Sequence, residues 1–137
     1  MKWKTETIQF STDQQCQLVD ITSELEDKIS FTGIKSGVCI INIPHATAGL
    51  VINENEEGVK EDILNRILAL APGDISYQHD QIDNNARAHI ISSIIGTDNV
   101  LIIENGQLVR GTWQNIFFVE LDGPRFARQV VVKFFGE

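Results

Sequence analysis

Apolar and polar residues alternate along much of the chain, and this pattern predicts its strands. Residues 2–12 alternate as a half-buried strand does, and residues 16–21, beyond a turn at 13–15, are its predicted partner. Residues 38–44 form an almost unbroken apolar run, which is typical of a central strand covered on both faces. After a polar loop at 45–49, a short apolar run follows at 50–52.

Three further segments have the spacing of helices. Ser23 and the acidic residues after it have the capping-box pattern, which predicts a helix running to a C-cap at Gly33. Apolar residues recur at helical spacing within 56–71, and Pro72-Gly73 ends that helix. After a polar loop at 77–83, residues 84–95 are predicted to form another amphipathic helix, closed by Gly96.

The last third of the chain is predicted to be an antiparallel meander. Segments 100–104 and 107–110 flank Asn105-Gly106, a strong two-residue hairpin signal. Segments 115–121 and 126–135 flank a turn at Asp122-Gly123-Pro124. Together the elements predict an α+β fold, a β-rich antiparallel single domain over residues 1–137 with about three helices. Such a sheet leaves a face or edge to cover, which favours an oligomer.

Composition narrows the function classes. With 137 residues, 42% hydrophobic and 22% charged, the chain has ordinary globular usage. Its net charge of −8 argues against a nucleic-acid partner, because phosphate backbones require clustered Lys and Arg. No signal peptide or membrane-spanning run is evident, so we expect a cytoplasmic protein without a membrane partner. Cys16 and Cys39 are interpreted as small buried hydrophobes rather than as a disulfide or metal ligands.

The candidate chemistry is concentrated around three histidines, His45, His79 and His89. Their spacing matches no helical zinc motif. Two interpretations therefore stay open: the three histidines bind one metal ion, or each has an ordinary role on the surface or in the core. The segment between the last two histidines is crowded with short polar residues: Asp80, Asp83, Asn84 and Asn85. These side chains are expected either to orient imidazoles or to cap the following helix, whose N-terminus also attracts anions.

Three other polar segments have plainer interpretations beside the functional ones. Ser92-Ser93 lacks the G-x-S-x-G elbow of a serine nucleophile and fits a mid-helix pair bonded to the backbone. Gly111-Thr112-Trp113-Gln114 interrupts the meander, either as a bulge that aims side chains at a site or as a packing contact. The acidic residues at 56–62 are interpreted as charges that interact favourably with the N-terminal end of their helix dipole.

Eight segments, taken in order, carry a further signal: His45-Ala46-Thr47-Ala48, Asn53-Glu54-Asn55-Glu56, His79-Asp80, Asn84, Ala88-His89-Ile90, Ser92-Ser93, Gly111-Thr112-Trp113-Gln114 and Leu121-Asp122-Gly123-Pro124-Arg125. In this combination they resemble the YjbQ family across essentially the whole chain. The resemblance implies a homotrimer with a weak thiamine-phosphate synthase activity, which joins an aminopyrimidine methyl diphosphate to a thiazole phosphate and releases diphosphate. The sequence departs from the family pattern at Ala46 and Asn85.

The resemblance also implies a set of site residues and a ligand. Expected catalytic residues are His45, His79, His89 and Asp83. Expected substrate-binding residues are Thr47, Asn53, Glu54, Asn84, Ser92, Thr112 and Gln114. A divalent metal, zinc before others, is expected on the three histidines with an open fourth position, and the substrate is a small phosphorylated metabolite. The alternatives are a metal-dependent hydrolase of small esters or phosphates, and a non-enzymatic trimeric metabolite-binding protein.

Overall fold

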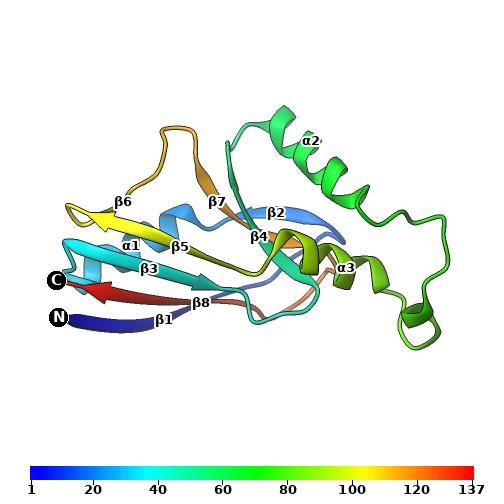
Figure 1. The fold of residues 1–137 in the computed structure, drawn as a ribbon, viewed down its shortest axis with the longest axis horizontal. Helices are drawn as coiled ribbons and strands as arrows, with labels where there is room; N and C mark the ends of the chain where they lie inside the picture. The colour runs from blue at the N-terminus through cyan, green and yellow to red at the C-terminus, as the bar shows by residue number, and fades with distance from the viewer.

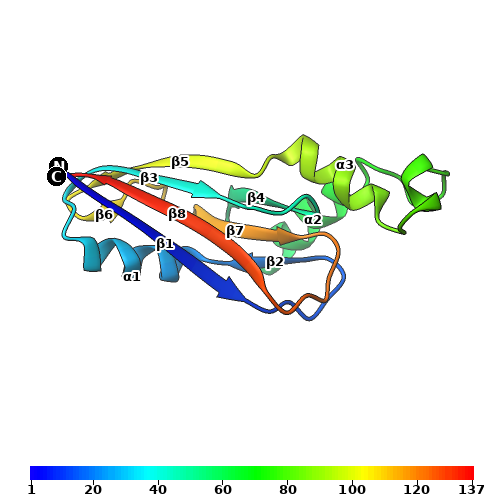
Figure 2. The same ribbon diagram turned by 90° about the horizontal axis from the view of Figure 1, so that it is seen from below.

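The computed structural model describes residues 1–137 and contains two antiparallel sheets that face each other across a shared core (Figure 1). The five strands of sheet A are, in spatial order, β1 (Lys2–Phe10), β8 (Arg128–Gly136), β3 (Ser36–Asn42), β5 (Asp98–Glu104) and β6 (Gln107–Leu108). The three strands of sheet B are β2 (Gln17–Asp20), β7 (Asn115–Glu120) and β4 (Ala48–Asn53). The termini lie side by side at one end of sheet A (Figure 2), since Lys2 is paired with Gly136.

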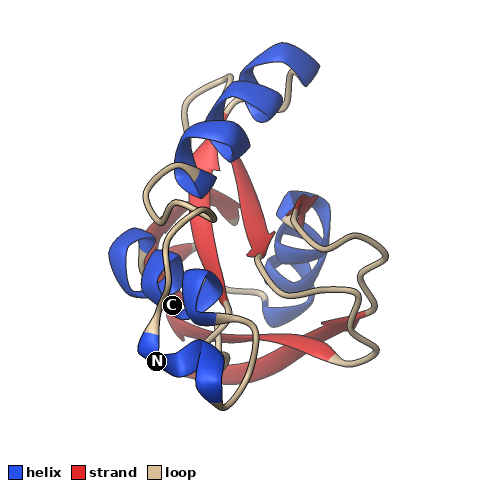
Figure 3. Ribbon diagram, turned by 90° about the vertical axis from the view of Figure 1, so that its right-hand side faces the viewer, coloured by secondary structure: helices blue, strands red, loops and turns tan.

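The helices are α1 (Thr22–Thr32), α2 (Glu57–Leu68) and α3 (Ala86–Ile95), with a short 3-10 turn, η1 (Gln78–Gln81), before α3. Figure 3 views the molecule from the end at which η1 and α3 lie. Helix α1 contributes to the core between the sheets, whereas α2 and α3 form a second, smaller core with sheet B. Neither these helices nor η1 are long and apolar enough to cross a membrane.

Strand β7 belongs to both cores because successive side chains point to opposite faces. Ile116 and Phe118 are buried between the two sheets, and Val119 packs against the helices. Burying side chains of this size is worth about 1.5–3 kcal/mol each, so β7 is a main contributor to stability. Glu120 continues the inward-facing series and has no exposed surface, which places a carboxylate inside the main core.

The predicted fold class is confirmed, with one correction at α1. The capping box at Ser23 is wrong, because the N-cap position is Ile21, two residues earlier, and the helix has no side-chain cap. Instead, the carboxylate of Asp20 accepts the backbone N–H and the hydroxyl of Thr22, at 2.9 and 2.6 Å. At the other end, Gly33 has the left-handed conformation expected of a C-cap, with φ of 73°.

The other predicted elements are present with shifted bounds. Asn105 and Gly106 have φ of 54° and 75°, which confirms the tight turn of the hairpin. The predicted polar loop at 77–83 contains η1, and the loop after β3 ends at Ala48, where β4 begins. Residues 111–114 form a turn between β6 and β7 rather than a bulge within a strand.

Candidate functional site

Two imidazoles meet where η1 passes the first turns of α3. The ring centroids of His79 and His89 are 4.7 Å apart, with an edge-to-face angle of 74°. Asn85 is the N-cap residue of α3, and its carbonyl accepts the N–H of His89, so both lie along one side of the helix. Both rings are half-buried. The chain therefore presents an imidazole pair at its surface.

Asn85 connects this pair to the loop between β7 and β8. Its Oδ1 lies 3.0 Å from Nε2 of His79, and its Nδ2 donates to Oδ2 of Asp122 at 2.8 Å. The same carboxylate oxygen accepts Nη2 of Arg125 at 2.7 Å. Asn85 thus orients an imidazole, as the sequence allowed, and its side chain does not cap α3.

The polar chain continues into the main core. Arg125 donates its backbone N–H to the hydroxyl of Thr12, which in turn donates to Glu120 at 2.7 Å. Glu120 forms a buried ion pair with Arg128, whose Nη2 also donates to the hydroxyl of Thr47 at 3.0 Å. Next to Arg128, the backbone N–H of Gln129 donates to Nε2 of His45 at 2.9 Å. Side-chain and backbone contacts therefore link the regions of His79 and His45.

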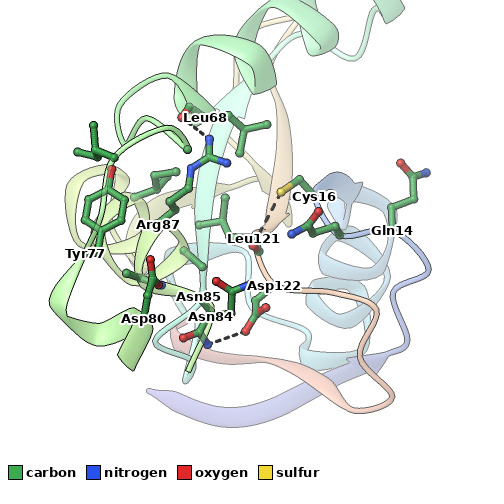
Figure 4. Close-up of a pocket in the computed structure, with 16 residues that line it drawn as sticks. Gln14, Cys16, Leu68, Tyr77, Asp80, Asn84, Asn85, Arg87, Leu121 and Asp122 are labelled. Atoms are coloured by element: carbon green, nitrogen blue, oxygen red, sulfur yellow. Dashed lines mark hydrogen bonds between the residues drawn. The ribbon is translucent and has the colours of Figure 1, made fainter. Parts of the chain in front are cut away.

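A cavity of about 530 Å³, termed here the Asn85 cavity, lies beside this polar chain (Figure 4). Its polar lining includes Tyr77, Asp80, Asn84, Asn85 and Asp122. Arg87 also lines it, but its guanidinium is occupied, since it donates to the carbonyls of Leu68 and Ala71 at the end of α2. The lining therefore offers two carboxylates and several amides, a surface suited to a polar ligand.

A second cavity, of about 440 Å³, is termed the Arg125 cavity. Its lining comes from the loop before β4 and the loop before β8, and its polar side chains are His45, Thr47, Arg125 and Arg128. No aspartate or glutamate lines it. Asp122 lines the first cavity and Arg125 the second, so their ion pair lies between the two.

The protonation states follow from these surroundings. Burial works against the charged form of Glu120, but hydrogen bonds from Arg128, Thr12 and the Asp122 N–H outweigh it and lower the pKa. Burial, together with the Arg128 charge, lowers the pKa of His45, so its imidazole is neutral at pH 7. Burial raises the pKa of Cys16, which lines the Asn85 cavity, so this residue is a thiol and not a reactive thiolate.

Comparison with known proteins assigns the chain to a family. Residues 6–137 match the family described as UPF0047 protein YjbQ-like. The chain belongs to this UPF0047 family. It is 42% identical to a UPF0047 protein of Methanocaldococcus jannaschii, over 94% of this chain and 92% of that one. It is 41% identical to the UPF0047 protein YugU of Bacillus subtilis, over 95% and 98% of the two chains.

Solved structures of UPF0047 relatives share the fold. A YbjQ-like protein of unknown function from Sulfolobus solfataricus superposes with a TM-score of 0.96 at 46% identity, over 99% of each chain. An uncharacterized YjbQ/UPF0047 protein from Clostridium acetobutylicum gives a TM-score of 0.89 at 37% identity, over 95% of this chain and 99% of that one.

These relatives correct the predicted activity. They are described as UPF0047 proteins, and the solved ones as uncharacterized or of unknown function. None of them is described as a thiamine-phosphate synthase or as a hydrolase. The prediction of a synthase-like transferase, with a metal-dependent hydrolase as its alternative, is therefore wrong.

The structure separates the residues that the UPF0047 resemblance implied into two groups. One group lies near the two cavities and the imidazole pair: His45, Thr47, His79, Asp83, Asn84, His89 and Ser92. The other lies at the opposite end of sheet B, where β4 ends and β7 begins: Asn53, Glu54, Thr112 and Gln114. A six-residue strand spans roughly 17 Å, so within one chain the second group does not reach the imidazole pair.

Several of these side chains have structural partners. Ser92 is buried and donates its hydroxyl to the carbonyl of Ala48 at 2.6 Å, which ties α3 to β4. Gln114 accepts the N–H of Gly111 at 2.7 Å and closes its own turn. Asp83 accepts the N–H of Asn84 at 2.9 Å.

The predicted three-histidine metal centre does not fit one chain. No group of three or more His, Cys, Asp or Glu side chains is arranged to hold a metal ion. His79 and His89 meet, whereas Nε2 of His45 is occupied by the N–H of Gln129. Zinc sites need three or four ligands, and this pair supplies two, so a zinc ion remains a prediction from the resemblance.

Sequence reasoning missed the residues that join the cavities, Glu120 and Arg128 above all. Both stand in strands at inward-facing positions of the alternating pattern, Glu120 after Phe118 and Arg128 before Val130. Two opposite charges on the buried faces of consecutive strands are a signal for a buried ion pair. Asp122 carried no such signal, because its partner Asn85 is 37 residues away.

Proposed function

We propose that the chain binds a small phosphorylated metabolite, with its phosphate in the Arg125 cavity. The observation that carries the proposal is the set of hydrogen-bond donors in that lining, which contains no carboxylate. In a chain with a net charge of −8, the cavity gathers two arginines, a histidine and a threonine, and no carboxylate. Such a concentration of donors favours an anion over any other ligand class.

Both guanidinium groups have donors left for an anion. Arg125 is half exposed and uses Nε and Nη2 on Asp122, which leaves Nη1 free. Arg128 uses Nε and Nη2 on Glu120 and Thr47. Its Nη1 has no protein partner and is not among buried unpaired atoms, so it reaches the cavity surface. One free guanidinium nitrogen from each arginine can therefore donate a charge-assisted hydrogen bond to a phosphate.

The volume and surroundings fit a metabolite rather than a macromolecule. A cavity of about 440 Å³ falls in the usual range for small-molecule sites. The Asp122–Arg125 pair separates it from the Asn85 cavity, whose amides and carboxylates suit a polar organic group. A ligand with its phosphate at Arg125 would extend its organic part past the Asp122–Arg125 pair and into the Asn85 cavity.

Calorimetric titration with inorganic phosphate and pyrophosphate tests the proposal. We expect saturable binding that weakens as ionic strength rises. Arg125→Gln should lower the affinity by about 10–150-fold, because a hydrogen bond to a charged group is worth about 1.5–3 kcal/mol. Arg110→Gln, in an ion pair with Glu26 at the far end of β7, is the matched control and should bind like the wild type. Absent binding, or equal binding by Arg125→Gln, would overturn the proposal.

We also propose that the chain assembles as a homotrimer, as the family resemblance implied. An open apolar face of sheet A supports assembly. Ile40, Val100 and Ile102 are 40%, 56% and 55% exposed, and Val38 and Phe135 flank them in register. Exposed patches of this kind mark interaction surfaces, and a second copy of the chain is the occupant we propose.

Light scattering tests the assembly directly. The expected mass is three times 15.3 kDa, and Ile102→Lys should reduce it by placing a charge in the interface. Ile82→Lys, in an 86% exposed position outside this face, is the control and should leave the mass unchanged. A wild-type mass of one chain would refute the trimer.

A further inference from the structure

One oxygen of Asp122 organises the contacts around Asn85. Oδ2 accepts one hydrogen bond from Nδ2 of Asn85, at 2.8 Å, and another from Nη2 of Arg125, at 2.7 Å. An ionised carboxylate is an acceptor only, whatever donates to it. It therefore selects the NH₂ end of the Asn85 amide, because the opposite orientation would set the amide oxygen against a carboxylate oxygen.

The orientation of this amide decides where His79 carries its proton. With Nδ2 on Asp122, the Oδ1 of Asn85 faces Nε2 of His79 at 3.0 Å. An amide oxygen only accepts, so Nε2 must carry the hydrogen. In the neutral ring Nδ1 then carries the lone pair. Nδ1 has no protein partner and is not among buried unpaired atoms, so it is accessible.

We propose that Asp122 and Asn85 are positioning residues that lock His79 as its Nε2–H tautomer and leave Nδ1 to accept a hydrogen bond from a ligand. His89 lies beside it. Its ring nitrogens have no protein partner and are not among buried unpaired atoms, so they are accessible too. The imidazole pair is therefore a site for a group that donates, a hydroxyl or an amine. This inference holds whether or not the Arg125 cavity binds phosphate, so the two proposals can fail separately.

His45 provides an internal reference with the opposite tautomer. Its Nε2 accepts the backbone N–H of Gln129, so in the neutral ring Nδ1 must carry the hydrogen. No side chain of the Asn85–Asp122 network takes part in that contact. Variants of the network should change the tautomer of His79 and leave that of His45 untouched.

Long-range ¹H–¹⁵N correlation spectra of protein labelled at histidine, recorded above the titration range of imidazole, test the inference. The wild type should show a pyrrole-type Nε2 and a pyridine-type Nδ1 for His79, and the reverse for His45. Asn85→Ala removes the acceptor, and Asp122→Asn lets the amide turn round. In both, the ring should exchange between tautomers, and its two nitrogen shifts should move towards each other.

Arg125→Gln is the matched control, because it removes the other donor to Asp122 and keeps the Asn85 contact. Its His79 shifts should stay at their wild-type values. The unchanged His45 pattern shows in each spectrum that the fold is intact. A wild-type His79 with hydrogen on Nδ1, or with averaged shifts, would overturn the inference without any variant. So would shifts that Asn85→Ala and Asp122→Asn leave unmoved.

Discussion

Replacing Glu120 with glutamine keeps the shape of the side chain and removes its charge. In the wild type Oε1 accepts from Thr12 and from Nε of Arg128, while Oε2 accepts from Nη2 of Arg128 and the N–H groups of Leu121 and Asp122. A glutamine amide has one acceptor oxygen, so its NH₂ end must face at least one of these donors. The variant also leaves Arg128 buried without a counter-charge.

The magnitude follows from burial. Glu120 is fully buried and Arg128 is 5% exposed, so water cannot replace the lost partner. Breaking a buried pair by removing one member costs about 3–5 kcal/mol. For a domain of this size that loss lowers the thermal midpoint by about 10–20 °C. Removing both charges, in Glu120→Gln with Arg128→Met, should restore part of the loss, because no unpaired charge remains.

The pH dependence of the free energy of unfolding should also reflect the buried Glu120 carboxylate. The pKa of Glu120 is lower in the folded state than in the unfolded chain, so its contribution is complete above about pH 4.3 and is lost as pH falls through the folded value. The wild type should lose stability in this acid window, and Glu120→Gln should lack that portion of the loss.

Urea denaturation followed by circular dichroism, at neutral and acid pH, measures these effects. Glu61→Gln, on the exposed surface of α2, is the control and should lie within about 0.5 kcal/mol of the wild type. A Glu120→Gln protein within about 1 kcal/mol of the wild type would refute the reasoning. An acid profile identical to that of the wild type would do the same.

Three further predictions concern other sites. Ser92→Ala should cost about 1–3 kcal/mol in the same assay, because the carbonyl of Ala48 loses its buried donor; a neutral result would show that water replaces the hydroxyl. Gly123→Ala should cost at least about 1–3 kcal/mol, since its Cβ would meet the backbone oxygen of Gln14 at 2.1 Å, and an unchanged denaturation midpoint would contradict this contact. Burial lowers the pKa of His45, so its contribution to stability is complete above about pH 6.5 and falls on acidification; His45→Gln should flatten thermal midpoints across that window.

The strands and helices could largely be predicted from the sequence, because their signals are local. Alternation in β1 and the turn at Asn105-Gly106 both reflect neighbours in the chain. The start of α1 was mispredicted for a related reason. Ser23 satisfies a local capping rule, but Asp20 at the end of β2 binds Thr22, and the helix begins there, two residues before the start that a cap at Ser23 predicts.

The site was less predictable because its contacts are long-range. Asn85 and His89 share one side of α3, and their spacing alone indicates this. The contact between the Asn85 amide and Asp122 depends on how the β7–β8 loop passes α3. No local sequence pattern encodes that path. The resemblance grouped Gln114 with the histidines, but sheet topology places it at the other end of β7.

Strand β8 has a consequence for how the chain folds. It lies between β1 and β3 in sheet A, yet it is synthesised after the other strands of both sheets. Until it is complete, β1 has no partner in that sheet and β3 has one open edge. Pairing of residues at both ends of the chain gives a high contact order, which slows folding. Until β8 emerges, a growing chain therefore leaves the edges of β1 and β3 that β8 later covers open to aggregation, and chaperones that bind extended apolar segments have a target there.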